Sequence, residues 1–303
     1  MRLQANGIAI EVDDQGPPAG EPLLMVMGLG MQLTGWPDGL VQRLTQRGFR
    51  VIRLDNRDIG LSQSFDHLGM PNLAWAALRH TVHLPVHSPY SLADLATDAV
   101  GVLDALGLDS VHICGASMGG MIAQHLAAKH PQRVKSLTLM MTTSGARHLP
   151  QAGWRVQRAL LSRPDGRSPE AVVAHLEKVL RVIGSPAYPA PAEELRARLH
   201  AMVARSWRPA GTARQLAAVG ADGDRSPMLS KITAPTHVLH GAADPLVPPA
   251  AADDLVAKIK GATLEKLPGM GHDLPAPLFD SFVQAIASTA ERGASPMARG
   301  RPA

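Results

Sequence analysis

The sequence predicts an α/β protein in which a mostly parallel, eight-stranded sheet is flanked by helices and carries a helical insertion between strands six and seven. Two observations lead to this fold class. Short, continuous apolar runs such as 22–28 and 134–141 are typical of parallel strands that are buried on both faces. Amphipathic helical patterns alternate with such runs, except between 150 and 220, where helical patterns follow one another without a strand.

Length and composition fit one large domain with an insertion. The chain has 303 residues, of which 45% are hydrophobic and 18% are charged, which is ordinary for a globular protein. Its single cysteine, Cys114, excludes an intrachain disulfide, so nothing requires an oxidising compartment. The sequence carries neither a signal-peptide pattern nor a run of about 20 apolar residues. We therefore expect a cytoplasmic protein that does not bind a membrane.

The net charge of +4 is concentrated in one part of the chain. Residues 145–230 hold thirteen Lys and Arg against seven Asp and Glu. These arginines are spread along helical segments and are not interleaved with aromatic residues, which make up only 3% of the chain. The pattern indicates a solvated basic surface, so we expect no nucleic-acid partner.

The most informative stretch is 111–120, where an apolar strand pattern enters the motif Gly115-Ala-Ser117-Met-Gly119 and a helical pattern leaves it. A Gly-x-Ser-x-Gly turn between a strand and a helix is a nucleophile elbow, which raises a serine hydroxyl above the edge of a sheet. Glycines flank the serine because the strained turn leaves no room for side chains. The helix that follows directs its N–H groups at any anion formed there. We therefore predict that Ser117 is a nucleophile.

Two later loops supply the acid and the base that such a serine needs. An apolar strand pattern ends in Gly-x-x-Asp-Pro, which places Asp244 in the turn beyond that strand. A further strand pattern, 262–267, leads into Pro-Gly-Met-Gly-His, which places His272 in a Gly-rich loop. Ser, Asp and His then follow one another in the chain order that this fold uses, each at the end of a strand. Asp273 is a rival acid, but its side chain is expected to point away from the imidazole.

The loop after the strand 22–28 begins Met-Gly-Leu-Gly. In folds with a nucleophile elbow, this loop supplies one N–H of the oxyanion hole, and the residue after the nucleophile supplies the other. The predicted donors are the backbone amides of Leu29 and Met118. Gly28 is expected to border the substrate.

Several other segments receive structural predictions. Residues 3–12 alternate around an Asn-Gly pair and predict an opening β-hairpin. The loop 55–62, Asp-Asn-Arg-Asp-Ile-Gly-Leu-Ser, is assigned a structural role and no chemistry. Ser91 is predicted to cap a helix that runs to about residue 106, and Asp98 and Asp104 on this helix are expected to be solvated.

The Pro/His-rich stretch 80–89 is predicted to be an irregular loop. His80, His83 and His87 have a spacing that suggests metal ligands. Prolines break any helix that would align them, and no Cys or carboxylate joins the cluster. We therefore expect no metal ion, and no cofactor of another kind.

The helical insertion is predicted to form a cap over the sheet. Its apolar stripes and capping residues place the helices at about 152–162, 169–183, 192–206 and 210–219. Most of the apolar side chains are expected to pack against the sheet domain. Trp154, Met202 and Trp207 are candidates for lining a substrate pocket.

These elements predict the following domain organisation. The cap comprises 146–230, and the core domain comprises 1–145 and 231–292. The Gly/Pro/Arg-rich tail 293–303 is expected to be disordered.

Several motifs carry a resemblance to a known family. They are Val26-Met-Gly, Gly35-Trp-Pro-Asp38, Arg43-Leu44, Val51-Ile-Arg-x-Asp-x-Arg-Asp-x-Gly-x-Ser62, Gly-x-Ser-Met-Gly and Pro-Gly-Met-Gly-His272. The chain thereby resembles the α/β-hydrolases, and between Leu24 and Ser62 it is most similar to the aclacinomycin methylesterase group. Met27 stands where many α/β-hydrolases have His, a feature that this group shares. The resemblance implies the α/β-hydrolase fold and a Ser-His-Asp triad, and it does not extend to the cap.

Triad and resemblance together imply a serine hydrolase. We expect it to cleave a carboxylic ester of a small to medium, mainly apolar molecule through an acyl-enzyme intermediate. Lactonases, carbon–carbon bond hydrolases and cofactor-free perhydrolases use the same triad, so these activities stay open, as do the acyl and alcohol groups and the oligomeric state. Dehalogenases and epoxide hydrolases of this fold need an aspartate at the elbow, which Ser117 excludes. A catalytically silent receptor is a further alternative, but it would have no need of Ser117 and His272 together.

Overall fold

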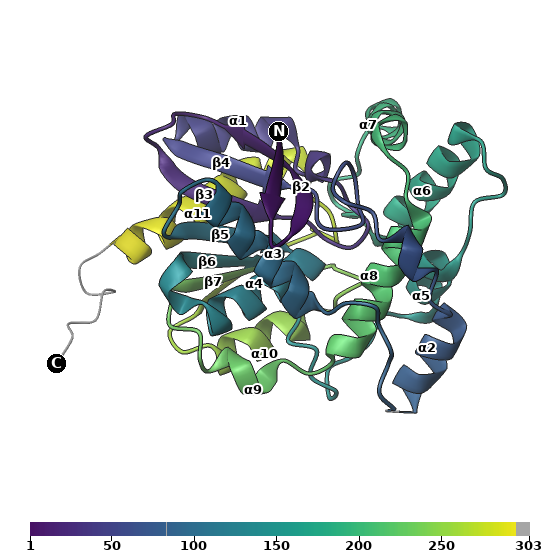
Figure 1. Cartoon of the computed structure of the whole chain (residues 1–303). Helices are drawn as coiled ribbons and strands as arrows, with labels where there is room; N and C mark the ends of the chain where they lie inside the picture. The colour runs from purple at the N-terminus through teal and green to yellow at the C-terminus, as the bar shows by residue number, and fades with distance from the viewer. Residues whose placement is uncertain (83, 295–303) are drawn as a thin grey trace.

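One eight-stranded sheet forms the centre of the molecule, and helices cover both of its faces (Figure 1). The computed structural model describes residues 1–82 and 84–294. Strand order is β1-β2-β4-β3-β5-β6-β7-β8, in which β1 and β2 run antiparallel to their neighbours and the other pairs are parallel. The predicted fold class is confirmed. The strands are β1 (Arg2–Ala5), β2 (Ile8–Gln15), β3 (Glu21–Val26), β4 (Phe49–Leu54), β5 (Val111–Ala116), β6 (Val134–Met140), β7 (Thr236–Gly241) and β8 (Thr263–Leu267).

The opening hairpin forms where the sequence predicts it. Asn6 and Gly7 have φ angles of 50° and 75°, and Ala5 pairs with Ile8 across the turn. A two-residue hairpin turn with positive φ at both central positions is a type I′ turn, which favours Asn-Gly.

Both faces of the sheet are apolar because both are covered. On β3, Leu23 and Met25 belong to one core cluster, and the alternate residues Leu24 and Val26 belong to the other. The first cluster is covered by α1 (Asp38–Gln46) and α11 (Phe279–Ala294), and the second by α3 (Leu92–Ala105), α4 (Met118–Lys129) and α10 (Ala250–Lys258). Alternate side chains of a strand point to opposite faces, so a doubly covered strand reads as a continuous apolar run.

The insertion between β6 and β7 consists of helices, as predicted. They are α5 (Trp154–Leu161), α6 (Pro169–Ile183), α7 (Ala192–Arg205), α8 (Pro209–Asp222) and the short α9 (Ser226–Leu229), which the sequence reading did not predict. In Figure 1, α5, α6 and α7 lie to one side of the sheet, and α8 lies between them and the core. The helices α6 and α7 share a small buried cluster made of Val173, Leu195, Leu199 and Met202. None of the helices in the described part of the chain is long and apolar enough to cross a bilayer.

One helix was missed. The stretch 80–89 is not irregular throughout, because residues 80 and 81 end α2 (Leu73–Thr81). The side-chain oxygen of Asn72 accepts a hydrogen bond from the Trp75 N–H at 3.0 Å, which caps the helix, and Ala and Leu in its first turns favour helix. This cap is the signal that could have found α2. His83 lies outside the described residues.

The last helix is longer than expected. It runs from Phe279 to Ala294, so residues 293 and 294 are helical, although the sequence reading placed them in a disordered tail. A Cβ on Gly293 would lie 2.3 Å from the Lys135 carbonyl oxygen, so the glycine lets the helix end pack against β6. Residues 295–303, the rest of the predicted tail, lie outside the described residues.

Short 3₁₀ helices complete the structure at Leu33–Gly35, Asp66–Leu68, Pro131–Arg133 and Ala276–Leu278.

The register of the parallel strands decides where the loops that follow them lie. Val26 at the end of β3 pairs with Gly115 near the end of β5, and Gly241 at the end of β7 pairs with Leu267 at the end of β8. The loops that follow these four strands therefore leave from the same edge of the sheet, where an open α/β sheet forms its crevice.

Candidate active site

Ser117 lies between β5 and α4 in a backbone conformation that side chains rarely adopt. Its φ is 54° and its ψ is −121°. A Cβ on Gly115 would lie 2.4 Å from the Gly119 carbonyl oxygen, and a Cβ on Gly119 would lie 2.0 Å from the Val26 carbonyl oxygen. Both flanking positions must therefore be glycine, which is the physical reason for the Gly-x-Ser-x-Gly motif.

A continuous chain of hydrogen bonds runs from Ser117 through His272 to Asp244. The Nε2 atom of His272 lies 3.0 Å from the Ser117 hydroxyl, and its Nδ1 atom lies 2.7 Å from Oδ2 of Asp244. An ionised carboxylate only accepts hydrogen bonds, so Nδ1 carries the proton and Nε2 is left as an acceptor for the serine hydroxyl. The three residues predicted from sequence are thus brought together so that His272 can accept the Ser117 proton while Asp244 holds the imidazole.

Asp244 is held from two sides. Its Oδ1 atom accepts hydrogen bonds from the Leu246 and Val247 amides, both at 2.9 Å. His240, at the end of β7, lies with Nε2 3.5 Å from Oδ2 of Asp244 and donates from Nε2 to the Val247 carbonyl at 2.8 Å. Burial lowers the pKa of His240, so this imidazole stays neutral beside the carboxylate. The sequence reading missed His240, although its position four residues before Asp244 was a usable signal.

The loop that carries His272 is held by the end of α6 and the residues just after it. The His272 amide donates to the Ile183 carbonyl at 2.8 Å, and the Gly271 amide donates to the Ser185 hydroxyl oxygen at 2.8 Å. The same hydroxyl donates to the carboxylate of Asp273. Burial raises the pKa of Asp273, and the hydrogen bonds from Ser185 oppose that rise. Asp273 is therefore bonded to Ser185, and Asp244 is bonded to the imidazole.

The predicted oxyanion donors lie beside the serine. A Cβ on Gly28 would lie 3.1 Å from Cβ of Ser117, so the residue before Leu29 is packed directly against the serine. Met118 is the first residue of α4, where N–H groups have no intrahelical acceptor. Among the hydrogen bonds of residues 1–82 and 84–294, neither the Leu29 nor the Met118 amide has an acceptor. Two unpaired backbone donors therefore belong to the residues that directly follow Gly28 and Ser117.

The loop 55–62 is a structural junction, as expected. Oδ1 of Asp55 accepts from the Leu33 amide at 2.7 Å, and Oδ2 accepts from the Leu61 amide and from Arg205 of α7, both at 2.8 Å. Both oxygens of Asp58 accept from Arg214 of α8 at 2.7 Å. The loop thereby ties two insertion helices to the core.

Asp98 was expected to be solvated because of its place on a helix, and this expectation is wrong. Its side chain is buried, with Nε and Nη2 of Arg57 at 2.6 and 2.7 Å and the Asn6 amide nitrogen at 2.8 Å. A carboxylate can be buried when an ion pair and hydrogen bonds replace its hydration. Asp104 agrees with the expectation, because its side chain is 62% exposed beside Arg133.

The predicted pocket residues occupy different environments. Met202 belongs to the buried α6–α7 cluster, and Met31, which follows the Leu29 loop, packs against that cluster and against the sheet core. Trp207 is 37% exposed. Trp154 is 70% exposed, with the guanidinium of its neighbour Arg155 6.0 Å from its ring. Pocket roles for Trp154 and Trp207 stay predictions.

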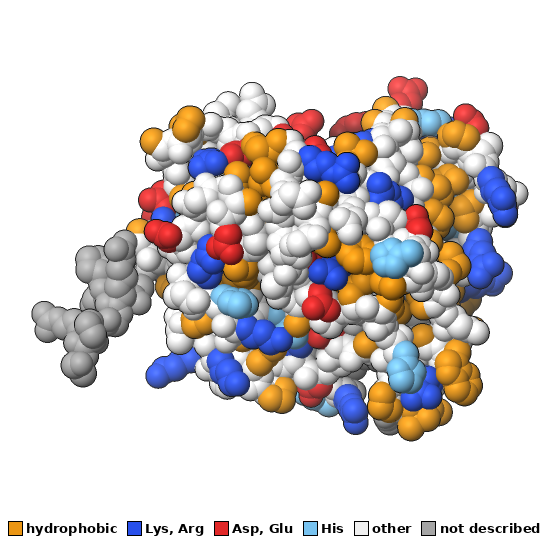
Figure 2. Space-filling view, in the orientation of Figure 1, with side chains coloured by type: hydrophobic (Ala, Val, Ile, Leu, Met, Phe, Trp, Pro, Cys, Tyr) orange, Lys and Arg blue, Asp and Glu red, His pale blue; other side chains and the backbone are white. Residues whose placement is uncertain are grey.

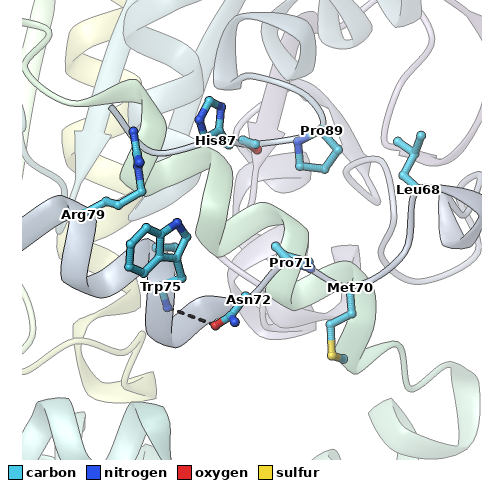
Figure 3. A pocket seen from close by; sticks show the side chains of 10 residues that line it. Leu68, Met70, Pro71, Asn72, Trp75, Arg79, His87 and Pro89 are labelled. Carbon is cyan, nitrogen blue, oxygen red and sulfur yellow. Dashed lines mark hydrogen bonds between the residues drawn. The ribbon is translucent and has the colours of Figure 1, made fainter. Parts of the chain in front are cut away.

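A separate hollow of about 370 Å³ lies between α2 and the segment 87–89 (Figure 3). Trp75, Arg79 and His87 line it, and none of its lining residues belongs to the Ser117–His272–Asp244 chain. Figure 2 shows apolar side chains gathered at the lower right, where Figure 1 places α2. This hollow is distinct from the hydrogen-bonded chain at the sheet edge.

Comparison with known proteins gives consistent matches. The sequence matches the family described as alpha/beta hydrolase fold over residues 21–275. Rhodomycin D methylesterase from Streptomyces sp. (strain C5) is 30% identical over 307 aligned positions, which cover 89% of this chain and 91% of the relative. A 2-hydroxy-6-oxononadienedioate/2-hydroxy-6-oxononatrienedioate hydrolase from Paraburkholderia xenovorans (strain LB400) is 30% identical over 273 positions, which cover 88% and 84%.

The structural likeness extends over the whole molecule. The crystal structure of the enol-lactonase from Burkholderia xenovorans LB400 matches with a TM-score of 0.73, and the match covers 96% of this chain and 100% of that chain. Sequence identity in this match is 23%, so it supports the fold and carries no conclusion about the substrate.

Proposed function

The chain belongs to the α/β-hydrolase family, and we propose that it hydrolyses a carboxylic ester by way of an acyl-enzyme on Ser117. The resemblance to an esterase group of this family is confirmed by the similarity to a methylesterase. The observation that carries the proposal is the pair of hydrogen bonds on His272, 3.0 Å to Ser117 and 2.7 Å to Asp244. A neutral imidazole so placed can accept the serine proton at Nε2.

In the proposed acylation step, the Ser117 oxygen attacks the ester carbonyl carbon while its proton moves to Nε2 of His272. The Asp244 carboxylate stabilises the imidazolium that forms and keeps the Nδ1 proton in place. The carbonyl oxygen becomes an oxyanion, which the amides of Leu29 and Met118 stabilise by hydrogen bonds. The N-terminus of α4 adds a favourable dipole for the same charge.

Collapse of the tetrahedral intermediate then breaks the ester bond. Nε2 of His272 gives its proton to the departing alcohol oxygen, and the acyl group stays on Ser117. In the second half, water attacks the acyl carbon and loses a proton to Nε2, which later returns it to the serine oxygen. The acid is released and the starting state is restored.

The proposed substrate is a small to medium, mainly apolar ester. Met31 links the loop of Leu29 to the apolar cluster of α6 and α7, so apolar side chains continue from that loop into the cap. The arginines by which α7 and α8 reach the core are already paired, Arg205 with Asp55 and Arg214 with Asp58. An uncharged substrate needs no additional cation in the pocket.

A carbon–carbon bond hydrolase is the second candidate, because one relative of similar identity and coverage carries the name of a dienedioate hydrolase. A substrate with two carboxylates needs partners for both charges. Arg205 and Arg214 are already paired with carboxylates of the protein, so they are poorly placed to bind a substrate carboxylate. This pairing favours an uncharged ester over a dicarboxylate. Lactone hydrolysis and perhydrolysis would use the same three side chains.

Product analysis tests the proposal. We expect the purified protein to release p-nitrophenol from short p-nitrophenyl esters, and Ser117→Ala to lower kcat by about 10⁵-fold or more, because nothing replaces the nucleophile. Thermal unfolding of the variant should match that of the unchanged protein, since the hydroxyl is the only group removed.

The alternatives have distinguishable outcomes. Hydrolysis of a dicarboxylate ring-fission product with no ester hydrolysis would favour the carbon–carbon bond hydrolase. A protein that neither turns over an ester nor reacts at Ser117 with a fluorophosphonate would contradict a serine hydrolase and favour a silent receptor.

We include a cytoplasmic location in the proposal, supported by the free and buried Cys114.

A further inference from the structure

The loop that carries Leu29 is a tight turn with one critical peptide. The Met31 amide donates to the Gly28 carbonyl at 3.2 Å, which closes a four-residue turn, and Gly30 has a φ of 68°. Positive φ at the third residue of such a turn marks type II, which requires glycine there. A type I turn differs mainly by a flip of the central peptide, here the peptide between Leu29 and Gly30. The Leu29 carbonyl and the Gly30 N–H point in different directions in the two forms, whereas the Leu29 N–H belongs to the preceding peptide, between Gly28 and Leu29.

A buried glutamine of the cap holds this central peptide. The Gly30 amide donates to Oε1 of Gln215 at 3.0 Å, and Nε2 of Gln215 donates to the Arg57 carbonyl at 3.0 Å. The side chain of Gln215 is fully buried, so water does not compete for either bond. Rotating the side-chain amide would set its NH₂ group against the Gly30 N–H and its oxygen against the Arg57 oxygen. The arrangement therefore has one favourable orientation.

The position of Gln215 is itself fixed by the packing of α8. Arg214, the preceding residue, pairs with both carboxylate oxygens of Asp58 at 2.7 Å. Thr212, three residues earlier and on the same side of the helix, packs against Gly30, where an added Cβ would lie 2.8 Å from its Cγ2 atom. The helix and the turn are thus in direct contact at two successive points.

We propose that Gln215 is a positioning residue for the oxyanion hole: it anchors the Leu29–Gly30 peptide to α8 and thereby holds the adjoining Gly28–Leu29 peptide, which carries the Leu29 N–H, in place beside Ser117. This inference rests on the proposed function, because it gives Leu29 a catalytic task. The cap then contributes to the chemical step as well as to substrate binding.

The expected loss of kcat is smaller than the loss caused by removing an oxyanion donor altogether. Removing one oxyanion donor outright lowers kcat by about 10²–10³-fold. Without Gln215 the Leu29 N–H remains, but the turn that carries it has lost its anchor to α8. We therefore expect Gln215→Met to lower kcat by roughly 10–100-fold and to change KM by less than about threefold, because the pocket is unchanged.

The experiment measures two reactions of the full chain. One is the kcat and KM for a short p-nitrophenyl ester. The other is the rate constant for labelling of Ser117 by a fluorophosphonate, which forms a tetrahedral adduct at the serine and needs no knowledge of the natural substrate. The matched control is Ser206→Ala, which removes a 2.8 Å hydrogen bond between the cap and the Gly60 carbonyl without touching the turn. Methionine has nearly the shape of glutamine and cannot replace its hydrogen bonds.

The inference is supported if Gln215→Met lowers kcat and the labelling rate together by tenfold or more while Ser206→Ala stays within threefold of the unchanged protein. It is overturned if a folded Gln215→Met is labelled at the unchanged rate, or if both variants lose activity equally. If the methionine variant does not fold, Gln215→Asn gives the same readout, because its shorter side chain keeps a polar group but cannot span Gly30 and Arg57. Failure of the unchanged protein to react with the fluorophosphonate would contradict the proposed function itself, which separates the two outcomes.

Discussion

Replacing Asp244 by asparagine is expected to lower kcat by about 10³–10⁴-fold, and the hydrogen bonds of the carboxylate explain why. Oδ1 accepts from the Leu246 and Val247 amides at 2.9 Å, and Oδ2 accepts from Nδ1 of His272 at 2.7 Å. The two backbone donors bind only an oxygen, so the asparagine NH₂ group must face His272. Nδ1 then becomes an acceptor and Nε2 carries the proton, which leaves the imidazole unable to accept the proton of Ser117.

The magnitude follows from two contributions. Turning the asparagine around would leave two buried N–H donors without acceptors, at about 1 kcal/mol or more each. At roughly 2 kcal/mol in total, only a few per cent of the molecules hold the active tautomer. Losing the charged acceptor removes a further ~1.5–3 kcal/mol of imidazolium stabilisation, or about 10–100-fold in rate. The product is roughly 3 × 10²- to 3 × 10³-fold, and because about 1 kcal/mol is the lower limit for each unpaired donor, we expect about 10³–10⁴-fold, close to the ~10⁴-fold loss for the same substitution in a serine protease.

Asp273→Asn is the matched control, because Asp273 bonds to the Ser185 hydroxyl and not to the imidazole. We expect a loss of less than about tenfold, since an asparagine oxygen still accepts the hydroxyl proton. Both variants are assayed for kcat on one p-nitrophenyl ester, with thermal unfolding as a check on folding. A larger loss for Asp273→Asn than for Asp244→Asn would refute the assignment of the acid.

Two further predictions concern the pocket and acid stability. For linear acyl esters, kcat/KM should fall beyond roughly eight carbons, because the apolar pocket is expected to be shorter than that of a lipase, and a steady rise to palmitoyl esters would contradict this. Burial favours a raised pKa for Asp222, but the hydrogen bond from His125 and the charge of Arg225 outweigh it and hold that pKa below its ordinary value. Its ionised form therefore stabilises the fold above about pH 4, and this contribution is lost as the pH falls through the lowered pKa. Urea unfolding at several pH values between 5 and 2 should show a weaker loss of stability for Asp222→Asn, whereas an unchanged pH dependence would be evidence against this role.

The sheet and the hydrogen-bonded chain could be predicted because local backbone chemistry marks them. Glycines at 115 and 119 are required by contacts of 2.4 and 2.0 Å that any Cβ would make, so a steric need of the fold is visible in the sequence. Asp244 and His272 follow strands whose apolar runs are readable, and parallel strands bring their ends to one edge. That these residues are catalytic stays a prediction until variants are measured.

What could not be predicted depends on partners far away in the chain. Asp98 has the pattern of a surface residue on a helix, and only the fold brings Arg57, 41 residues earlier, against it. Ser185 and Gln215 sit in segments with no motif, and their hydrogen bonds to Gly271 and Gly30 join residues 86 and 185 positions apart. Propensity and periodicity describe neighbours along a helix or strand, so such pairings leave no local trace.

These distant pairings change how the cap is best understood. Ile183 at the end of α6 and Ser185 just after it hold the amides of His272 and Gly271, and Gln215 of α8 holds the amide of Gly30. Two insertion segments therefore fix the two loops that, in the proposed mechanism, carry the base and one oxyanion donor. A lid that only admitted substrate would need contacts with the rim of the crevice and none with these backbones. Exchanging the cap for that of another hydrolase should consequently lower kcat even for a substrate that still fits.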